Sequence, residues 1–571
     1  MRILFITTSH NGLSQRAWSE LLAKGHDIKI QLATSDDAML DAVEAFRPEL
    51  ILAPFLKKAI PDIIWKNHTC LIVHPGIKGD RGPSSLDWAI MRGYKEWGVT
   101  ILQAAEEMDA GDIWSSNNFP MRDVSKSNLY RHEVTAAALK GIHDAVSKFE
   151  SLDFVPEALN YSNPDVKGCW NDPIKRVDRA IDWASSSQDI IAKIKAADST
   201  PGVLESHIFP FPCFMYGAHL EDKLKGNAGE ILAQRDSAIC IATGDGAIWV
   251  SHLKKELSGG FKLPAMKVLA GHIAEPMFSA RDIFNDDLSI KTFREIWYRE
   301  EDNVSYLYFD FYNGAMSTEQ CLRLREAFWN VQSQRKTQII VLMGGHDIWS
   351  NGIHLNVIEN AISPAQESWD NIVAMDDFVC DVVSCTSHYI ISALHGNAGA
   401  GGAVMALAAD EVIAREGVVF NPHYKKMGLF GSEYWTYLLP KRVGVDKANQ
   451  LTSECLPVDT KKALEIGLID AAFGQNVKAF RDNLSKRVEA IKNTIDFEKF
   501  TSEKRKKLLS EEAIKSLNDY RNDELREMWV NFNSLNSPYH ILRYSFVHKI
   551  DCVNQPKTYQ PDRLESIPNV N

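Results

Sequence analysis

The stretch TCLIVHPGIKGDRGPSS, residues 69–85, predicts a buried strand that ends directly at a histidine. Pro75 cannot continue a strand ladder and biases His74 toward an extended conformation, so the imidazole stands where the strand gives way to a loop. The glycines of this loop allow its backbone to approach a ligand closely. An imidazole there can exchange protons near neutral pH, which makes His74 a candidate catalytic residue. The alternative is a structural histidine that caps the end of the strand.

The sequence around this stretch predicts an α/β domain. Short apolar runs alternate with amphipathic segments from residue 1 to about residue 120. The expected strands are 2–7, 28–33, 50–53 and 70–73. The first expected helix is 14–24. Largely apolar runs of this kind are typical of parallel strands that are covered on both faces. We therefore expect a doubly wound sheet, whose ligands bind beyond the carboxyl ends of the strands, where His74 lies.

The pattern changes after about residue 160 and returns to strand–helix alternation at residue 304. In the middle region a helix precedes short strands punctuated by glycines, which predicts a small β-barrel of OB-like type. These expected elements are 181–197, 230–233, 238–242 and 247–252. In the last region the expected elements are strands 304–311, 338–343 and 389–393 and helices 319–333 and 365–385, followed by a charged helical tail after residue 477.

Composition limits the functions that are open to the chain. Its 571 residues are too many for one core and indicate several domains. A net charge of −12 argues against nonspecific binding to nucleic acid or to an anionic membrane. The nine cysteines form no CxxC pair, so we expect a reduced chain without a metal site. With no secretory signal and no apolar run of about 18 residues, we expect a cytoplasmic protein.

A second polar signal follows the strand expected at 98–103. A carboxylate in the acidic turn 106–112, such as Asp109, would set the tautomer of His74 and raise its basicity if it lay close by. A solvated turn is the alternative. The ordered set MRILFITTSHNG, PFLKKAIP, VHPGIKGDRGPSSLDWAI and GVTILQAAEEMDAGDI resembles the 10-formyltetrahydrofolate-dependent formyltransferases, such as methionyl-tRNA formyltransferase.

This resemblance implies a set of site residues. The family places an Asn, a His and an Asp around the formyl carbon, and His74 and Asp109 match the last two. The Asn position falls on Ile72, and loss of one oxyanion donor costs about 10²- to 10³-fold in rate. Another group therefore supplies the donor, or the formyl acceptor is unusual. The implied folate-binding residues are Phe55, Leu56, Lys57 and Glu106. Residues 179–184, 194–197 and 201–203 resemble the C-terminal domain of methionyl-tRNA formyltransferase.

A second motif pair lies in the last region. WSNGIHL at 349–355 is followed by HGNAGAGGA at 395–403. A glycine-rich turn that opens a helix presents free N–H groups, which can bind phosphate or stabilise an oxyanion. Tight helix–sheet packing is the alternative. Together with the later stretches 408–414, 421–429 and 458–470, the pair resembles the crotonase (enoyl-CoA hydratase/isomerase) superfamily.

The crotonase resemblance implies an oxyanion hole for a thioester, made by the backbone N–H groups of Ile353 and Gly401. The two glutamates of a hydratase land on Val404 and Tyr424, so ordinary water addition is not expected. Tyr424, with Glu433 one short loop later, is a candidate proton-transfer pair. The alternative is that the phenol packs and the carboxylate is solvated. Arg442 and Arg543 are candidates for contacts with coenzyme A phosphates.

The two resemblances combine into one hypothesis. A module that uses 10-formyltetrahydrofolate, joined to a module that binds coenzyme A (CoA), could make formyl-CoA. The whole-chain order resembles the HypX (HoxX) family of NiFe-hydrogenase maturation factors. That resemblance implies that formyl-CoA is split to carbon monoxide for the iron of the hydrogenase, with hydrogenase assembly proteins as possible partners. The alternatives are an amine formyltransferase with a structural crotonase domain, and a non-catalytic maturation scaffold.

The expected organisation follows from these resemblances. We expect a formyltransferase-like catalytic domain, a β-barrel domain like the formyltransferase C-terminal domain, a linker, a crotonase-like ββα spiral domain and a helical extension. Their expected boundaries are, in that order, 1–150, 151–255, 256–295, 296–475 and 476–571.

Overall fold

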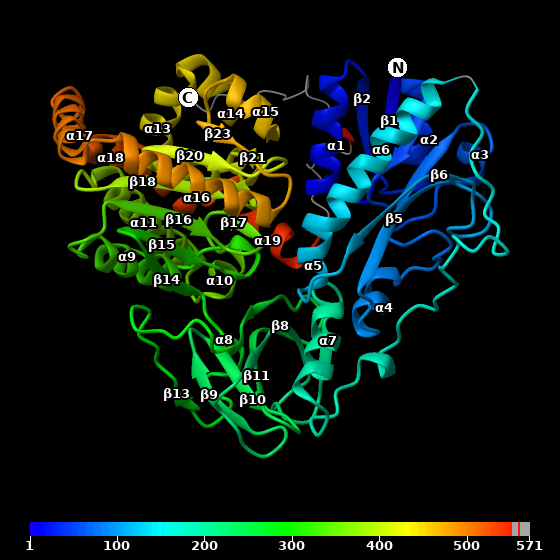
Figure 1. Cartoon of the computed structure of the whole chain (residues 1–571), viewed down its shortest axis with the longest axis horizontal. Helices are drawn as coiled ribbons and strands as arrows, with labels where there is room; N and C mark the ends of the chain where they lie inside the picture. The colour runs from blue at the N-terminus through cyan, green and yellow to red at the C-terminus, as the bar shows by residue number, and fades with distance from the viewer. Residues whose placement is uncertain (152, 551–557, 560–571) are drawn as a thin grey trace.

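The computed structural model describes all residues except 152, 551–557 and 560–571, so the end of the expected helical extension lies outside the described residues. Three bodies are visible in Figure 1: an N-terminal module, a smaller middle domain below it, and a C-terminal module beside it. Helices α1 and α6 of the N-terminal module lie on the side that faces the C-terminal module. No helix in the described part of the chain is long and apolar enough to cross a bilayer.

The N-terminal module is built on one sheet with the order β24-β2-β1-β3-β4-β5-β6. Strands β1 to β4 run parallel, whereas β5 and β6 are antiparallel. The strands are β1 Arg2–Thr7, β2 Asp27–Leu32, β3 Leu50–Ala53, β4 Cys70–His74, β5 Glu96–Gln103, β6 Ile113–Pro120 and β24 Thr558–Tyr559. The helices are α1 Gly12–Ala23, α2 Asp36–Phe46, α3 Asp62–Trp65, α4 Ser85–Met91, α5 Lys126–Leu129 and α6 Thr135–Glu150, and a π-helical turn, Tyr130–Val134, joins the last two.

The sequence explains why these elements form. All four residues of β3 are buried, which requires cover on both faces of the sheet. Asn11 and Ser35 cap α1 and α2, because each side chain accepts a hydrogen bond from a backbone N–H of the first turn. The expectation of a doubly wound sheet is confirmed, and β4 ends at His74 on its carboxyl edge.

The middle domain is a curved, largely antiparallel sheet rather than a closed barrel. The pairing order is β13-β9-β10-β11-β8-β7, with β12 on β11, and the described strands do not close into a ring. The expected closure is therefore not found. The elements are α7 Ser187–Ala197, β7 Val203–Glu205, β8 Cys213–Glu221, β9 Ile231–Arg235, β10 Ala238–Ala242, β11 Ala247–Lys255, β12 Leu263–Pro264, α8 Ala265–Leu269 and β13 Met277–Phe278. Residues 256–295, expected as a linker, thus contribute two short strands and a helix to this domain.

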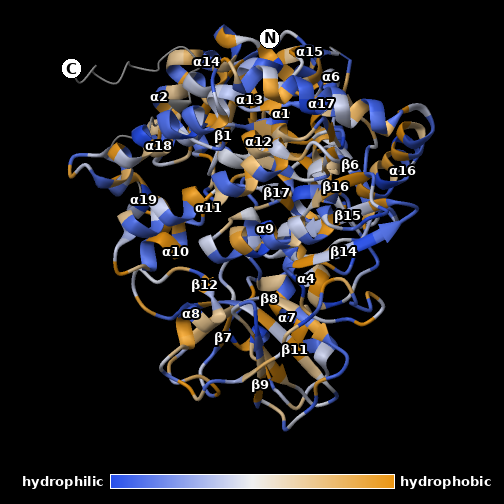
Figure 2. Cartoon of the chain, turned by 90° about the vertical axis from the view of Figure 1, so that its left-hand side faces the viewer, coloured by the Kyte–Doolittle hydropathy of each residue, from blue (hydrophilic) through white to orange (hydrophobic). Residues whose placement is uncertain are grey.

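The C-terminal module has two sheets. The larger has the order β14-β15-β16-β18-β20-β23 and the smaller β17-β19-β21-β22. The strands are β14 Ile296–Glu301, β15 Val304–Phe309, β16 Ile339–Gly344, β17 Ile348–Ser350, β18 Tyr389–Leu394, β19 Asn397–Gly399, β20 Glu411–Ala414, β21 Val419–Asn421, β22 Val458–Asp459 and β23 Ala471–Ala472. Figure 2 shows the hydrophilic edge strand β14, whose Arg299, Glu300 and Glu301 are exposed and oppose pairing with another sheet edge.

Helices surround and extend these sheets. They are α9 Thr318–Gln332, α10 Leu355–Asn360, α11 Pro364–Ser384, α12 Gly401–Met405, α13 Trp435–Val443, α14 Val445–Glu454, α15 Thr460–Glu465, α16 Val477–Thr494, α17 Phe497–Glu512, α18 Leu517–Asn533 and α19 Pro538–His548. Helices α18 and α19 do not project into solvent, because Leu525, Met528, Phe532 and Tyr539 belong to the largest buried core of the module. The C-terminal extension is therefore part of the folded C-terminal module.

Replacement of Phe328 tests which helix face carries the C-terminal core. Phe328 is fully buried on α9 and packs edge to face against Phe378 on α11, 5.9 Å between ring centroids. Phe328→Ala is expected to lower the free energy of unfolding of this module by about 3 to 5 kcal/mol, measured by urea denaturation of the full chain. Leu322→Ala on the exposed face of the same helix serves as the control, with an expected change within about 0.5 kcal/mol. Equal losses in the two variants would contradict the packing described here.

Candidate active sites

The first site is the imidazole of His74, which lies between two carboxylates. Its Nε2 is 2.9 Å from Oδ2 of Asp80, and its Nδ1 is 3.5 Å from Oδ1 of Asp109. All three side chains are at least mostly buried. The structure thus brings together His74 and Asp109, as expected, and adds Asp80, which sequence reasoning missed.

Two carboxylates beside one imidazole favour its protonated form. Burial alone lowers the pKa of His74, but the hydrogen bond with Asp80 and the charges of Asp109 and Asp80 outweigh it and raise the pKa. Both carboxylates are held in turn by other groups. Asn171 Nδ2 donates to Asp80 Oδ1 at 2.8 Å, and the Gly82 N–H donates to Asp109 Oδ2 at 3.1 Å. The site is therefore poised to donate a proton near neutral pH.

Gly76 is required for this arrangement. A methyl group on Gly76 would stand 2.3 Å from Asp80 Oδ2 and 2.4 Å from His74 Nε2. Only glycine leaves room for the pair to form. Asp80 could have been suspected from its place in the GDRG loop six residues after His74, whereas Asn171 comes from the segment that leads into the middle domain and carries no comparable signal.

The predicted folate-binding residues surround the same sheet edge. The carbonyl oxygen of Phe55 accepts hydrogen bonds from Thr8 N and Thr7 Oγ1, so the loop after β3 is tied to the end of β1. Lys57 is exposed, and its N–H donates to Thr8 Oγ1 at 2.8 Å. Leu56 is half-buried beside this loop, and Glu106 is exposed on the loop after β5. Their role in folate binding stays a prediction.

The second site is centred on two backbone turns. Gly352 has a left-handed φ of 75°, and a methyl group on it would stand 3.2 Å from the Gly401 nitrogen. Gly401 is the first residue of α12, and Ala400 before it has a φ of 46°, which is strained for a residue with a side chain. Among the described residues, neither the Ile353 nor the Gly401 N–H donates a hydrogen bond to a protein group. This geometry suits an oxyanion hole.

The carboxyl of Glu433 lies directly against this turn. A methyl group on Gly401 would stand only 1.9 Å from Glu433 Oε1. Glu433 is 3% exposed, so the reading of a solvated carboxylate is wrong. Burial, followed by the charges of Asp376 and Glu524, raises its pKa well above the usual range. Tyr424 is also buried, and burial followed by the charge of Glu433 raises the pKa of its phenol.

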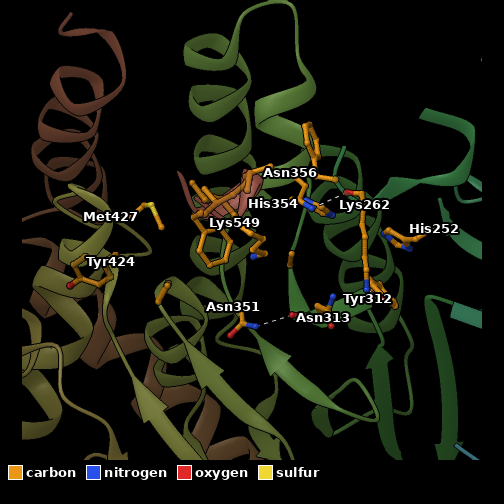
Figure 3. Close-up of a pocket in the computed structure, with 18 of the residues that line it drawn as sticks. His252, Lys262, Tyr312, Asn313, Asn351, His354, Asn356, Tyr424, Met427 and Lys549 are labelled. Carbon is orange, nitrogen blue, oxygen red and sulfur yellow. Dashed lines mark hydrogen bonds between the residues drawn. The ribbon is translucent and has the colours of Figure 1, made fainter. Parts of the chain in front are cut away.

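Both residues border one cavity of about 690 Å³ between the C-terminal module and the middle domain. Ile353 and Gly401 also line it. Figure 3 shows Lys262 and Tyr312 on one side of the cavity and Tyr424 and Met427 on the other. The cavity is large enough for the acyl and pantetheine parts of a thioester.

The lining of the cavity carries positive charge. Lys254, Lys262 and Lys549 line it. Lys262 Nζ donates to the Tyr312 hydroxyl at 2.9 Å, and this hydroxyl donates to Asp198 Oδ1 at 2.7 Å. Burial lowers the pKa of Lys262 to about 8, with the Asp198 charge opposing the change. Nothing in the sequence marked these lysines, because two come from the middle domain and Lys549 follows α19 of the C-terminal module, so they line one cavity only in the fold.

The two arginines proposed for coenzyme A lie elsewhere. Arg442 Nη1 is 2.7 Å from both carboxylate oxygens of Asp470, and Arg543 Nε is 2.7 Å from Glu359 Oε2. Neither arginine lines the cavity. Lys549, six residues after Arg543, does. In the part of the chain that the structure describes, no group of three or more His, Cys, Asp or Glu side chains is arranged to hold a metal ion.

Comparison with known proteins agrees with the order of the modules. The family models for formyl transferase, for its C-terminal domain and for enoyl-CoA hydratase/isomerase match residues 18–146, 173–272 and 302–527. Methionyl-tRNA formyltransferase of Nitrosomonas europaea is 24% identical over 259 residues, covering 44% of this chain and 75% of that protein.

A curated protein and a solved structure match the chain over nearly its full length. The hydrogenase maturation factor HoxX of Bradyrhizobium diazoefficiens is 40% identical over 570 residues, which cover 100% of this chain and 98% of that protein. The crystal structure of HypX from Aquifex aeolicus in complex with tetrahydrofolic acid is 43% identical, with a TM-score of 0.93 and 97% of each chain covered. The chain therefore belongs to the HypX/HoxX family of hydrogenase maturation factors.

Proposed function

We propose that this protein transfers the formyl group of 10-formyltetrahydrofolate to coenzyme A and then splits formyl-CoA into carbon monoxide and free coenzyme A. The carbon monoxide would serve as the iron ligand of a NiFe-hydrogenase. One observation carries the proposal: a single chain holds both an imidazole between two carboxylates and a cavity in which an oxyanion-hole turn faces a buried carboxyl. The tetrahydrofolic acid complex of the Aquifex aeolicus protein supports a folate carrier for the first step.

In the first step the coenzyme A sulfur attacks the formyl carbon. The S–H proton is lost as the S–C bond forms, and N10 of the folate gains a proton as the N–C bond breaks. The imidazolium of His74 is placed to give N10 its proton, and the proton that the thiol gives up restores the imidazolium, with Asp80 and Asp109 holding its ring. Its positive charge would also offset the oxyanion, which compensates in part for the amide that is missing at Ile72. The products are tetrahydrofolate and formyl-CoA.

In the second step the thioester carbonyl would lie against the N–H groups of Ile353 and Gly401. The Glu433 proton moves to sulfur as the C–S bond breaks with its electron pair on sulfur. The C–H electron pair stays on carbon, and the formyl proton returns to the carboxylate, so carbon monoxide and the thiol leave and Glu433 is restored. Tyr424 borders the same cavity and would orient the formyl group. A shielded cavity limits hydrolysis of the thioester.

The lysines that line the cavity fit the phosphates of coenzyme A better than the two predicted arginines do. Three lysines lie there, whereas Arg442 and Arg543 are engaged by carboxylates outside it. The amine formyltransferase alternative requires no such cavity, and the scaffold alternative requires no buried carboxyl at an oxyanion-hole turn. These observations favour the coupled reaction over both.

The direct assay supplies the full chain with 10-formyltetrahydrofolate and coenzyme A and traps gas with reduced haemoglobin. We expect the carbonyl spectrum to appear only when both substrates are present. Glu433→Gln should lower the rate of carbon monoxide release by about 10²-fold or more, while tetrahydrofolate is still released. A formylated amine formed without coenzyme A, or an unchanged haem spectrum with the wild-type chain, would contradict the proposal.

Removal of the Asp80 charge should change the titration of His74. Asp80→Asn removes a hydrogen bond and a charge that raise the pKa of His74, so the imidazolium should lose its proton at a pH about 1 to 3 units lower. The measurement is a histidine NMR titration, with the His74 signal identified by its loss in His74→Gln. Asp62→Asn on the exposed surface of α3 is the control. An unchanged midpoint would show that Asp80 does not set the charge of His74.

Lys262 should make coenzyme A binding depend on pH. A charge-assisted contact with phosphate contributes about 1.5 to 3 kcal/mol, so Lys262→Met should raise the Kd of coenzyme A by about 10- to 100-fold. Because the pKa of Lys262 is lowered to about 8, its charge is lost as the pH rises through about 8, and affinity should fall there in the wild type but not in Lys262→Met. Calorimetry measures both effects, with Lys267→Met on α8 as the control. Similar affinities for the two variants would place the phosphates elsewhere.

A further inference from the structure

The loop that presents Glu433 is held almost entirely by its neighbours. Residues Glu433 and Tyr434 have φ values of 59° and 60°, two consecutive left-handed conformations that cost free energy in residues with side chains. Helix α13 begins after them without a side-chain cap of its own, because Tyr434 makes no capping hydrogen bond. Such a backbone persists only when surrounding groups hold it in place.

Two buried carboxyls supply that support. Glu524 Oε2 accepts the Tyr434 N–H at 2.9 Å, and Glu524 Oε1 accepts the Thr436 N–H at 2.7 Å. Asp376 Oδ1 accepts the Glu433 N–H at 2.8 Å. Glu524 therefore caps α13 from another helix, α18, while Asp376 on α11 fixes the residue that carries the candidate acid.

We propose that Asp376 and Glu524 are positioning residues for Glu433, which hold its carboxyl against Gly401 and keep it in the neutral, proton-donating form. The role of Glu433 as a proton donor to the thioester rests on the proposed function. The effect of Asp376 and Glu524 on the position and protonation of Glu433 does not. It also gives a role to α18, since Glu524 lies on this helix, in the segment expected from the sequence as a helical extension.

Hydrogen bonding decides which carboxyl keeps a proton. Ser432 Oγ is 2.8 Å from Asp376 Oδ2 and 3.4 Å from Glu524 Oε2, so these two groups flank one hydroxyl. Glu524 accepts from two backbone N–H groups and the Thr436 hydroxyl, and donors of this kind stabilise a carboxylate. Glu433 accepts only from the Ser432 N–H, at 3.2 Å, among the described residues. The proton therefore belongs on Glu433.

The charges around Glu433 point the same way. The titratable groups that interact with it or with its two neighbours are Asp376 and Asp377 on α11, Glu524 and Arg521 on α18, Cys321 on α9, and Tyr424. The one cation among them, Arg521, pairs with Asp377 at 2.6 Å rather than with Glu433. Burial raises the pKa of Asp376 to about 7, and burial followed by the Asp376 charge raises that of Glu524 to about 8. Burial, followed by the negative charges of Asp376 and Glu524, raises the pKa of Glu433 well above its usual range.

The test is an infrared titration of the full chain between pH 5 and about 10. The C=O stretch of a protonated carboxyl, identified by its loss in Glu433→Gln, should persist above neutral pH in the wild type. In Asp376→Asn and in Glu524→Gln it should disappear at a pH lower by about 1 unit or more, because each variant removes one neighbouring charge. Glu527 lies on the same helix, α18, but is exposed to solvent, so Glu527→Gln is the control and should leave the midpoint unchanged.

Activity supplies a second readout. In both variants the kcat for carbon monoxide release from formyl-CoA should fall by about 10-fold or more, with the alkaline limb at lower pH, while the Kd of coenzyme A changes by less than about 2-fold. Circular dichroism checks that both variants fold. If either Asp376→Asn or Glu524→Gln misfolds, the other variant still tests the proposal. Equal titration midpoints in the wild type and both variants overturn the proposal. The expected infrared shifts without any carbon monoxide from the wild type would overturn the proposed function and leave the positioning role standing.

Discussion

The contact between the Glu433 carboxyl and the bare α-carbon of Gly401 is the constraint on which the second site depends. The carboxyl occupies the space that any side chain at Gly401 would need. The same glycine begins α12, whose first N–H donates to no protein group among the described residues and can therefore polarise a carbonyl. An electrophilic turn and a proton donor are thereby held at one point of the cavity. Loss of either Gly401 or the loop that carries Glu433 would separate them.

In both sites two acidic side chains flank the group that carries the proton, but they favour its charged form in one site and its neutral form in the other. At His74, two carboxylates flank an imidazole and favour its charged form. At Glu433, two carboxyls flank a third and favour its neutral form. In each case buried negative charge retains a proton, because like charges are costly in a low-dielectric interior and an opposite charge is stabilised there. Both reactions of the proposed sequence need a proton at the start, so the common arrangement has a chemical reason.

Much of the fold was predictable because its strands are apolar and its motifs are local. The strand expected at residues 50–53 coincides with β3, and the glycine-rich turn before Gly401 was found from its composition. Asp80 and Glu524 were missed because their roles arise from tertiary contacts: one reaches back across a loop, and the other comes from a helix 90 residues away from the Tyr434 N–H it accepts. The middle barrel was expected to close, but alternation along each strand does not specify how the sheet edges meet.

The central claim is that one carbon passes from a folate to sulfur and leaves as carbon monoxide. A single-turnover reaction with 10-formyltetrahydrofolate labelled with ¹³C in the formyl group tests it most directly, with products followed by mass spectrometry and gas-phase infrared absorption. The account predicts transient labelled formyl-CoA, followed by ¹³C-labelled carbon monoxide in an amount equal to the tetrahydrofolate formed. Label recovered as formate or as a formylated amine, with none in the gas, would contradict it.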